Sequence, residues 1–176
     1  MLFRFATLAA ALALTACAPM PQNPILQGPI SHASLRSASG SSAMGEAHFT
    51  QRGSIVVVSG EIRGLKPNAL HGFHVHERGD CSSGDGMSTG GHFNPEGRPH
   101  GNHADMTHHA GDLLSLTADA SGVVKFSFEA SGIAVGAGPN DVVGRGLIVH
   151  RDPDDYTTQP NGNSGPRIAC AVITRG

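Results

Sequence analysis

The chain has 176 residues, a formal net charge of −2 and only two lysines, Lys66 and Lys125, so nucleic acid is not expected as a partner. This length suits one domain with a hydrophobic core and is too short for two. Abundant glycine, a charged fraction of 15 % and the absence of tryptophan favour an all-β or loop-rich domain over a helical one.

Residues 1–16 have the pattern of a signal peptide, with one arginine before an apolar run that is too short to span a bilayer. The tetrapeptide 14–17 resembles a bacterial lipoprotein box, which predicts a lipidated Cys17 after cleavage and membrane anchoring in the periplasm or cell envelope. The alternative is cleavage at an ordinary A-x-A-like site, which would release a soluble periplasmic protein. Lipidation of Cys17 leaves Cys81 and Cys170 as an even pair, in a compartment that permits disulfides.

Residues 17–30 are predicted to form an extended tether, since four prolines fall within 18–30. The folded domain is therefore expected to cover 31–176.

Short segments with alternating or continuous apolar character, separated by turn residues, predict eight strands. They lie at 32–38, 45–51, 54–65, 71–77, 115–118, 124–129, 146–150 and 168–173. We expect 115–118 to pair with 124–129 as a hairpin through the turn 119–122, and Gly60 could mark a bulge. The pattern indicates an antiparallel sandwich or barrel.

Two long segments without strand character, 78–112 and 151–167, interrupt this pattern. Loops of this length in a compact domain are usually functional or disordered. We therefore expect the functional residues to lie in or beside them.

Three histidines are predicted to lie on strand faces. His74 and His76 are two residues apart, so they share one face while Phe73 and Val75 point into the core. His150 shares its outer face with the residue two before it, and could join the other two if the strands are neighbours. Such a cluster suits copper or zinc, whereas the alternative reading is a set of exposed polar positions.

The first long loop adds His92, His100, His109 and Asp112. Three imidazoles and a carboxylate make a closed tetrahedral zinc set of the structural type. A zinc ion would hold a loop that is otherwise expected to be mobile.

Five motifs, in order from about residue 45 to residue 173, carry a family resemblance: GFHVHERGD, GGHFNP, HHAGDL, GLIVHRDPDD and GPRIACAVI. Together they resemble copper/zinc superoxide dismutases of the secreted bacterial kind. The resemblance implies an all-β fold, an eight-stranded antiparallel Greek-key β-barrel or sandwich with two long functional loops.

The resemblance implies one copper and one zinc per chain. Copper would take His74, His76, His92 and His150. Zinc would take His92, His100, His109 and Asp112, with His92 bridging the two metals.

Other residues acquire roles by the same resemblance. Asp154 would join His74 to His100, and His71 would bond the backbone near His150. Arg167 would attract and orient a small anion above the copper.

The resemblance also pairs Cys81 with Cys170 in a disulfide. The implied activity is dismutation of superoxide to oxygen and hydrogen peroxide by an alternately reduced and oxidised copper, with a structural zinc. This activity would protect the cell envelope from superoxide.

Two segments depart from the family pattern. Residues 155–166 form a shorter loop than in the animal enzymes and contain no lysine, so steering of superoxide must be local. Residues 82–91 belong to a subloop that often takes part in dimer contacts in bacterial relatives, which leaves both a monomer and a homodimer open.

Two histidines, His103 and His108, have no assigned ligand role. His103 is expected to be solvated, and His108 to point away from the zinc that His109 would bind. Two other readings of the whole chain are a metal-binding protein without turnover and a structural lipoprotein whose histidines are surface polar groups.

Overall fold

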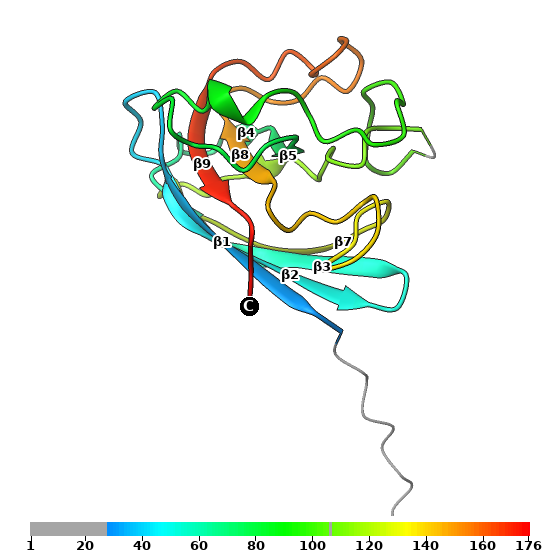
Figure 1. Ribbon diagram of the computed structural model, residues 1–176. Coiled ribbons are helices and arrows are strands. Elements are labelled where there is room, and N and C mark those ends of the chain that lie inside the picture. The colour runs from blue at the N-terminus through cyan, green and yellow to red at the C-terminus, as the bar shows by residue number, and fades with distance from the viewer. Residues whose placement is uncertain (1–27, 106) are drawn as a thin grey trace, which may run out of the picture.

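The computed structural model describes residues 28–105 and 107–176 (Figure 1). The described part contains one short 3₁₀ turn, η1 (Met87–Thr89). Its strands are β1 (Ile30–Ser37), β2 (Met44–Arg52), β3 (Ile55–Arg63), β4 (Leu70–His71), β5 (Phe73–His76), β6 (Leu116–Thr117), β7 (Val124–Ala130), β8 (Gly146–His150), β9 (Arg167–Val172) and β10 (Thr174–Arg175). Within these ranges no helix has the length and apolar character needed to cross a membrane.

The strands form a curled antiparallel sheet with two layers. Its order is β5-β8-β9-β1-β2-β3-β7, with β10 added beside β1. β1 joins the layers, because its first residues pair with β2 and its last two pair with β9. In Figure 1 the layer β1-β2-β3-β7 lies below, and β5, β8 and β9 lie above it. The predicted all-β antiparallel class is confirmed.

Alternation along the strands builds the core between the layers. From Ile30 to Arg36, β1 alternates between exposed and buried residues, as expected of a strand with one solvated face. Phe49 of β2 and Phe73 of β5 are completely buried, and Phe73 packs edge-to-face on Phe126 with ring centroids 5.5 Å apart. Burial of one such side chain contributes about 1.5–3 kcal/mol.

The predicted hairpin between 115–118 and 124–129 is wrong. β6 pairs with β4, with Leu70 opposite Thr117 and His71 opposite Leu116. This pairing buries Leu116, and a strand of two residues has too few ladder bonds to fix its partner by local pattern alone.

Gly60 does not mark a bulge, because the registers of β3 with β2 and with β7 run through it without a shift. A Cβ atom at this position would lie 2.1 Å from the carbonyl oxygen of Glu46 and 2.9 Å from the Phe126 ring. The glycine is required by close approach of a neighbouring strand and an aromatic ring.

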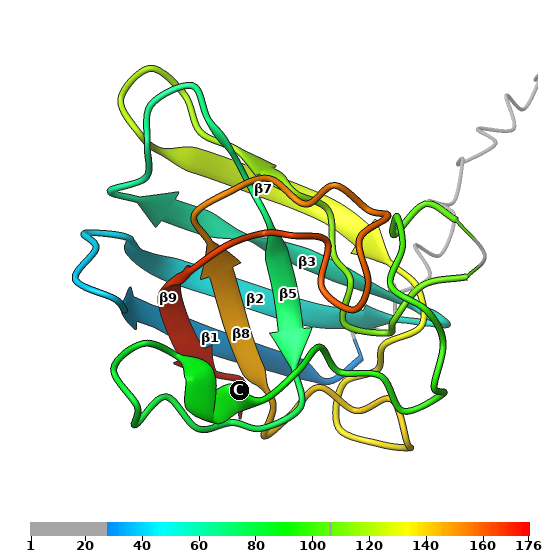
Figure 2. The same cartoon turned by 90° about the horizontal axis from the view of Figure 1, so that it is seen from above.

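The predicted strand 71–77 divides at Gly72 into β4 and β5. The amide of Gly72 donates to the carbonyl of Asp152 at 2.9 Å, and its carbonyl accepts from the amide of His150 at 2.8 Å. These bonds fix the second long loop beside β5. Viewed from above, both long loops lie over the layer that contains β5 and β8 (Figure 2).

Candidate metal centre

The face of β5 and β8 that points away from the core holds three histidines. His74 lies opposite Ile148, and His76 lies opposite Gly146, so β5 and β8 are neighbours as the cluster requires. His74, His76 and His150 are all buried, although they are on the outer face, because the long loops cover them. Phe73, Val75, Leu147 and Val149 fill the core on the opposite side.

The first loop brings His92 to this face by pairing with the free edge of β5. The amide of Val75 donates to the carbonyl of Gly111 at 2.9 Å, and its carbonyl accepts from Phe93 at 2.8 Å. His92 thereby forms an isolated bridge with His76. Its ring lies 4.0 Å from that of His74, measured between centroids.

His74, His76, His92 and His150 form one group whose candidate ligand atoms all lie within 4.8 Å of one another. Each has one buried ring nitrogen without a hydrogen-bond partner among the described residues: Nδ1 of His74 and Nε2 of the other three. The remaining nitrogens of His76 and His150 donate to the carbonyls of Gly90 and Gly165. Four converging lone pairs with no proton donor fit a cation of the copper or zinc type.

A second group consists of His92, His100, His109 and Asp112. The Nδ1 atoms of the three histidines lie 2.8, 3.1 and 3.2 Å from Oδ1 of Asp112. Ligand atoms around a tetrahedral zinc with bonds of about 2.0 Å are separated by about 3.3 Å. The three nitrogen–oxygen distances are therefore close to those of a closed zinc site.

His92 belongs to both groups. Its Nδ1 faces Asp112 at 2.8 Å, and its Nε2 faces the first group without a partner. One imidazole ring thus presents a nitrogen to each side.

Asp154 connects the two groups from behind. Its Oδ2 accepts from Nε2 of His74 at 2.7 Å, and its Oδ1 accepts from Nε2 of His100 at 2.9 Å. These bonds occupy Nε2 of both rings, so that Nδ1 of His74 points to the first group and Nδ1 of His100 points to Asp112. This is the orienting function expected of a carboxylate behind metal-binding histidines. The structure thus places Asp154 where the resemblance implied.

The backbone around His100 is held by Gln159, which sequence reasoning did not single out. The side-chain oxygen of Gln159 accepts from the amide of His100 at 2.8 Å, and its Nε2 donates to the carbonyl of His100 at 2.9 Å. A glutamine in a polar loop carries no distinguishing pattern in sequence. His71 donates from Nδ1 to the carbonyl of His150 at 2.8 Å and belongs to neither group.

Burial is the main cause of the altered pKa values of the first group. Desolvation, followed by the charges of neighbouring histidines, lowers the pKa of His76 and His150 well below the ordinary range and that of His92 to about 3. These imidazoles are neutral at physiological pH, which is the form that binds metal.

In and beside the second group, hydrogen bonds between carboxylates and histidines outweigh the effect of burial on the pKa values. Burial would raise the pKa of Asp112 and of Asp154, but hydrogen bonds from histidines outweigh it and hold both pKa values well below normal. Burial would likewise lower the pKa of His100, but its bonds to Asp112 and Asp154 raise it to about 9. Both carboxylates are therefore ionised and available to a cation or an imidazole.

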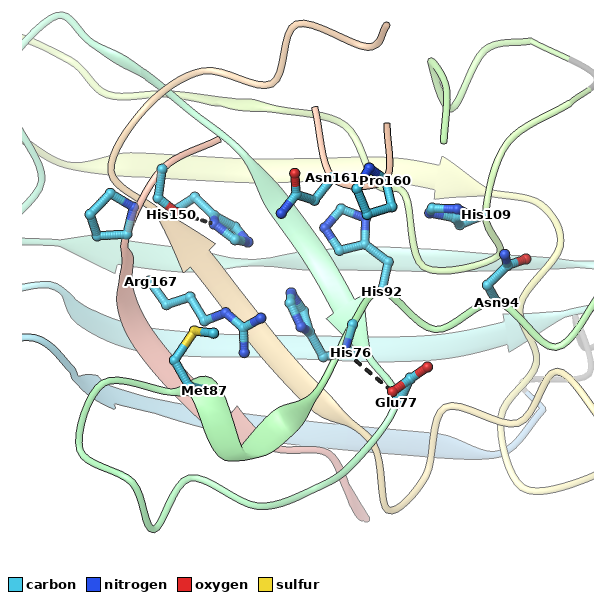
Figure 3. Close-up of a pocket in the computed structure, with 13 residues that line it drawn as sticks. His76, Glu77, Met87, His92, Asn94, His109, His150, Pro160, Asn161 and Arg167 are labelled. Carbon is cyan, nitrogen blue, oxygen red and sulfur yellow. Dashed lines mark hydrogen bonds between the residues drawn. The ribbon is translucent and has the colours of Figure 1, made fainter. Parts of the chain in front are cut away.

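Arg167 lies beside the first group, at the wall of a cavity of about 500 Å³ that is also lined by His76, His92 and His150 (Figure 3). Its Nη1 donates to the carbonyl of Gly86 at 2.7 Å and to Oγ1 of Thr89 at 2.9 Å. Its Nη2 donates to the carbonyl of Gly90 at 2.7 Å. The guanidinium is a fixed cation beside three histidines of the first group, in a cavity of the size of a small ligand.

The segment that holds Arg167 is itself tied to β9. A disulfide joins Cys81 to Cys170, which confirms the pairing that the resemblance implied. Met87, which lines the cavity, and Thr89, which accepts from Arg167, were not expected from sequence, because the loop 82–91 has no pattern that singles them out.

The two remaining histidines of the loop, His103 and His108, belong to neither group. His103 is half-buried, with its Nδ1 enclosed, and is not the solvated residue that we expected. His108 is buried and donates from Nδ1 to the carbonyl of its neighbour His109 at 2.6 Å. Packing of the loop against itself, which its sequence does not indicate, encloses both rings.

A family model described as copper/zinc superoxide dismutase matches residues 43–173, which include every residue of both histidine groups. The chain belongs to the copper/zinc superoxide dismutase family. The match confirms the resemblance seen in the five motifs.

One solved structure similar to this chain is the crystal structure of the clock protein EA4. It is 37 % identical to this chain, with a TM-score of 0.76, and the alignment covers 84 % of this chain and 94 % of EA4. At that identity and coverage the two chains share the β-fold over the aligned residues. The predicted signal peptide at 1–16, most of the tether 17–30 and the lipidated Cys17 lie outside the described residues.

Proposed function

We propose that the chain catalyses the dismutation of superoxide, in which two superoxide anions and two protons give oxygen and hydrogen peroxide. Copper would be held by His74, His76, His92 and His150, and zinc by His92, His100, His109 and Asp112. The observation that carries this proposal is the single imidazole of His92, which presents Nε2 to one group and Nδ1 to the other.

The bound copper would supply one-electron redox chemistry, and zinc, which has no accessible redox change, would order the loop and the bridging ring. Four lone pairs converge on one side, and three imidazoles with a carboxylate converge on the other. Both donor sets are suited to these ions.

The residues of the chain bind and orient the substrate anion. Arg167 is held by three acceptors from 86–90, so its guanidinium stays beside the cavity without reorganisation when an anion enters. Nε2 of His92 faces the same cavity and is the atom that would hold a proton for transfer to the reduced product. The covering loops exclude water from the other side of the rings.

We also propose that the protein acts in the cell envelope. The apolar segment before Cys17 supports export, and the disulfide between Cys81 and Cys170 is consistent with an oxidising compartment. Radiolabelled lipid attached to the wild-type chain but absent from Cys17→Ser would support the anchor. An unlipidated wild-type chain would support ordinary cleavage.

The function is tested by superoxide consumption of the copper- and zinc-loaded protein beside Arg167→Ala. Activity that requires both metals and falls in the variant, with metal content unchanged, supports the proposal. A loaded protein that is inert supports metal binding without turnover instead. A folded chain that takes up neither metal would contradict both.

A further inference from the structure

The outer face of the layer β1-β2-β3-β7 holds a pair of histidines that the metal centre does not use. His32 of β1 lies directly opposite His48 of β2 in the antiparallel register. Both residues are exposed, whereas the following or preceding residues Ala33 and Ala47 are buried in the core. The two residues therefore lie opposite each other on a solvated surface, on strands of the layer that lies below β5 and β8 (Figure 1).

The positions around this pair favour a cation. Along the same face the next register pairs are Ile30 with Thr50 and Ser34 with Glu46. Ser59 lies beside His48 on β3, and Thr174 lies beside His32 on β10. Among these described neighbours the only charged group is the carboxylate of Glu46, so none of them carries a positive charge that would repel an ion.

Opposite residues of an antiparallel pair have Cβ atoms about 4.5–5.5 Å apart, which places two imidazole rings within reach of one ion. We propose that His32 and His48 form a further metal site, a two-nitrogen chelate for a divalent transition cation of the Cu²⁺ class. Imidazole suits copper, nickel and zinc, and among divalent ions of this series copper binds most tightly. The proposal rests on strand register and exposure and does not depend on the proposed enzymatic function.

One existing contact must yield. The hydroxyl of Thr174 lies 3.1 Å from Nε2 of His32 and 3.3 Å from its carbonyl oxygen. This contact is exposed, so water can replace it at small cost when the ring turns toward His48. Removal of the hydroxyl should therefore leave the ion bound.

The test uses the full chain with its centre already loaded with copper and zinc, in a Cys17→Ser background that removes a competing thiol and the lipid. Titration with Cu²⁺, monitored by calorimetry and electron paramagnetic resonance, should show one additional copper per chain with two nitrogen ligands. Either His32→Ala or His48→Ala should weaken this binding about a hundredfold, because the second imidazole no longer acts at high effective concentration.

Two variants serve as controls. Thr174→Val keeps both imidazoles and should keep the additional ion, and His103→Ala removes a histidine elsewhere and should also keep it. Additional copper that persists in His32→Ala and His48→Ala would overturn the site. Loss of the ion in Thr174→Val, or a parent protein that binds no further copper at all, would overturn it as well.

Discussion

Gly162 occupies a position where the bridge between the two histidine groups has no room for a side chain. Its φ is +62°, and a Cβ atom there would lie 1.8 Å from Oδ1 of Asp154 and 2.5 Å from Nε2 of His100. These are the two atoms that form the 2.9 Å bond between carboxylate and imidazole. Gly162→Ala should therefore break that bond while leaving every candidate ligand in the chain.

The expected size follows from the geometry. Ordinary contact with a Cβ atom begins near 3.4 Å, so the Asp154 oxygen would have to move by 1.6 Å, the difference between 3.4 and 1.8 Å. A non-glycine residue at positive φ costs about 1–2 kcal/mol, and loss of a hydrogen bond to a charged group costs about 1.5–3 kcal/mol. Loss of an orienting partner of a metal-binding histidine weakens metal affinity by about 10–100-fold.

Gly53→Ala is the matched control, since Gly53 has a φ of +59° and no atom within 4 Å of its virtual Cβ. In both variants the strain of a side chain at positive φ should lower the free energy of unfolding of the metal-free chain, measured in denaturant. Only Gly162→Ala should also lose zinc more readily in competition with a chelator. Equal zinc affinity in the two variants would refute the role given to Asp154.

Four further outcomes are expected. Arg167→Ala should lower the bimolecular rate with superoxide about tenfold or more at unchanged metal content, measured by pulse radiolysis, and a normal rate would exclude it from substrate capture. The wild-type rate should fall with added salt in the same assay, whereas a rate independent of ionic strength would contradict electrostatic steering. Replacement of both Cys81 and Cys170 by serine should lower the free energy of unfolding by about 4.6 kcal/mol, from the sequence separation of 89 residues in the chain-entropy model, and a loss below about 1 kcal/mol would contradict it. His92→Ala should lower the content of both metals in elemental analysis, and full occupancy of either would contradict a shared ligand.

Local periodicity explains why much of this molecule was predictable. In a strand, residues two apart share a face, so His74 and His76 could be placed together and Phe73 assigned to the core from four residues of sequence. The same rule gave His150 its outer face. The residue types of the first long loop, and then the resemblance to the family, indicated the loop members that strand periodicity cannot predict.

Pairing between distant short segments was not predictable in the same way. β6 has two residues, and its turn suggested the nearer partner β7, yet it pairs with β4. The sequence shows Gly60 as a glycine within a strand, but the glycine is required because the carbonyl of Glu46 on the neighbouring strand leaves no room for a side chain. In both cases the deciding contact lies across the sheet and leaves no trace in the local sequence.

The loops show the same limit at the metal centre itself. Asp154 could be named from a motif, but Gly162, which makes room for it, stands in the polar run PNGNSG as one glycine among turn residues. Its requirement arises only when the second loop folds back, so that the amide of Asp155 donates to the carbonyl of Gly162 at 2.9 Å. Orientation of the imidazoles thus depends on residues that contact no ion, and the comparison of Gly162→Ala with Gly53→Ala separates that dependence from backbone strain.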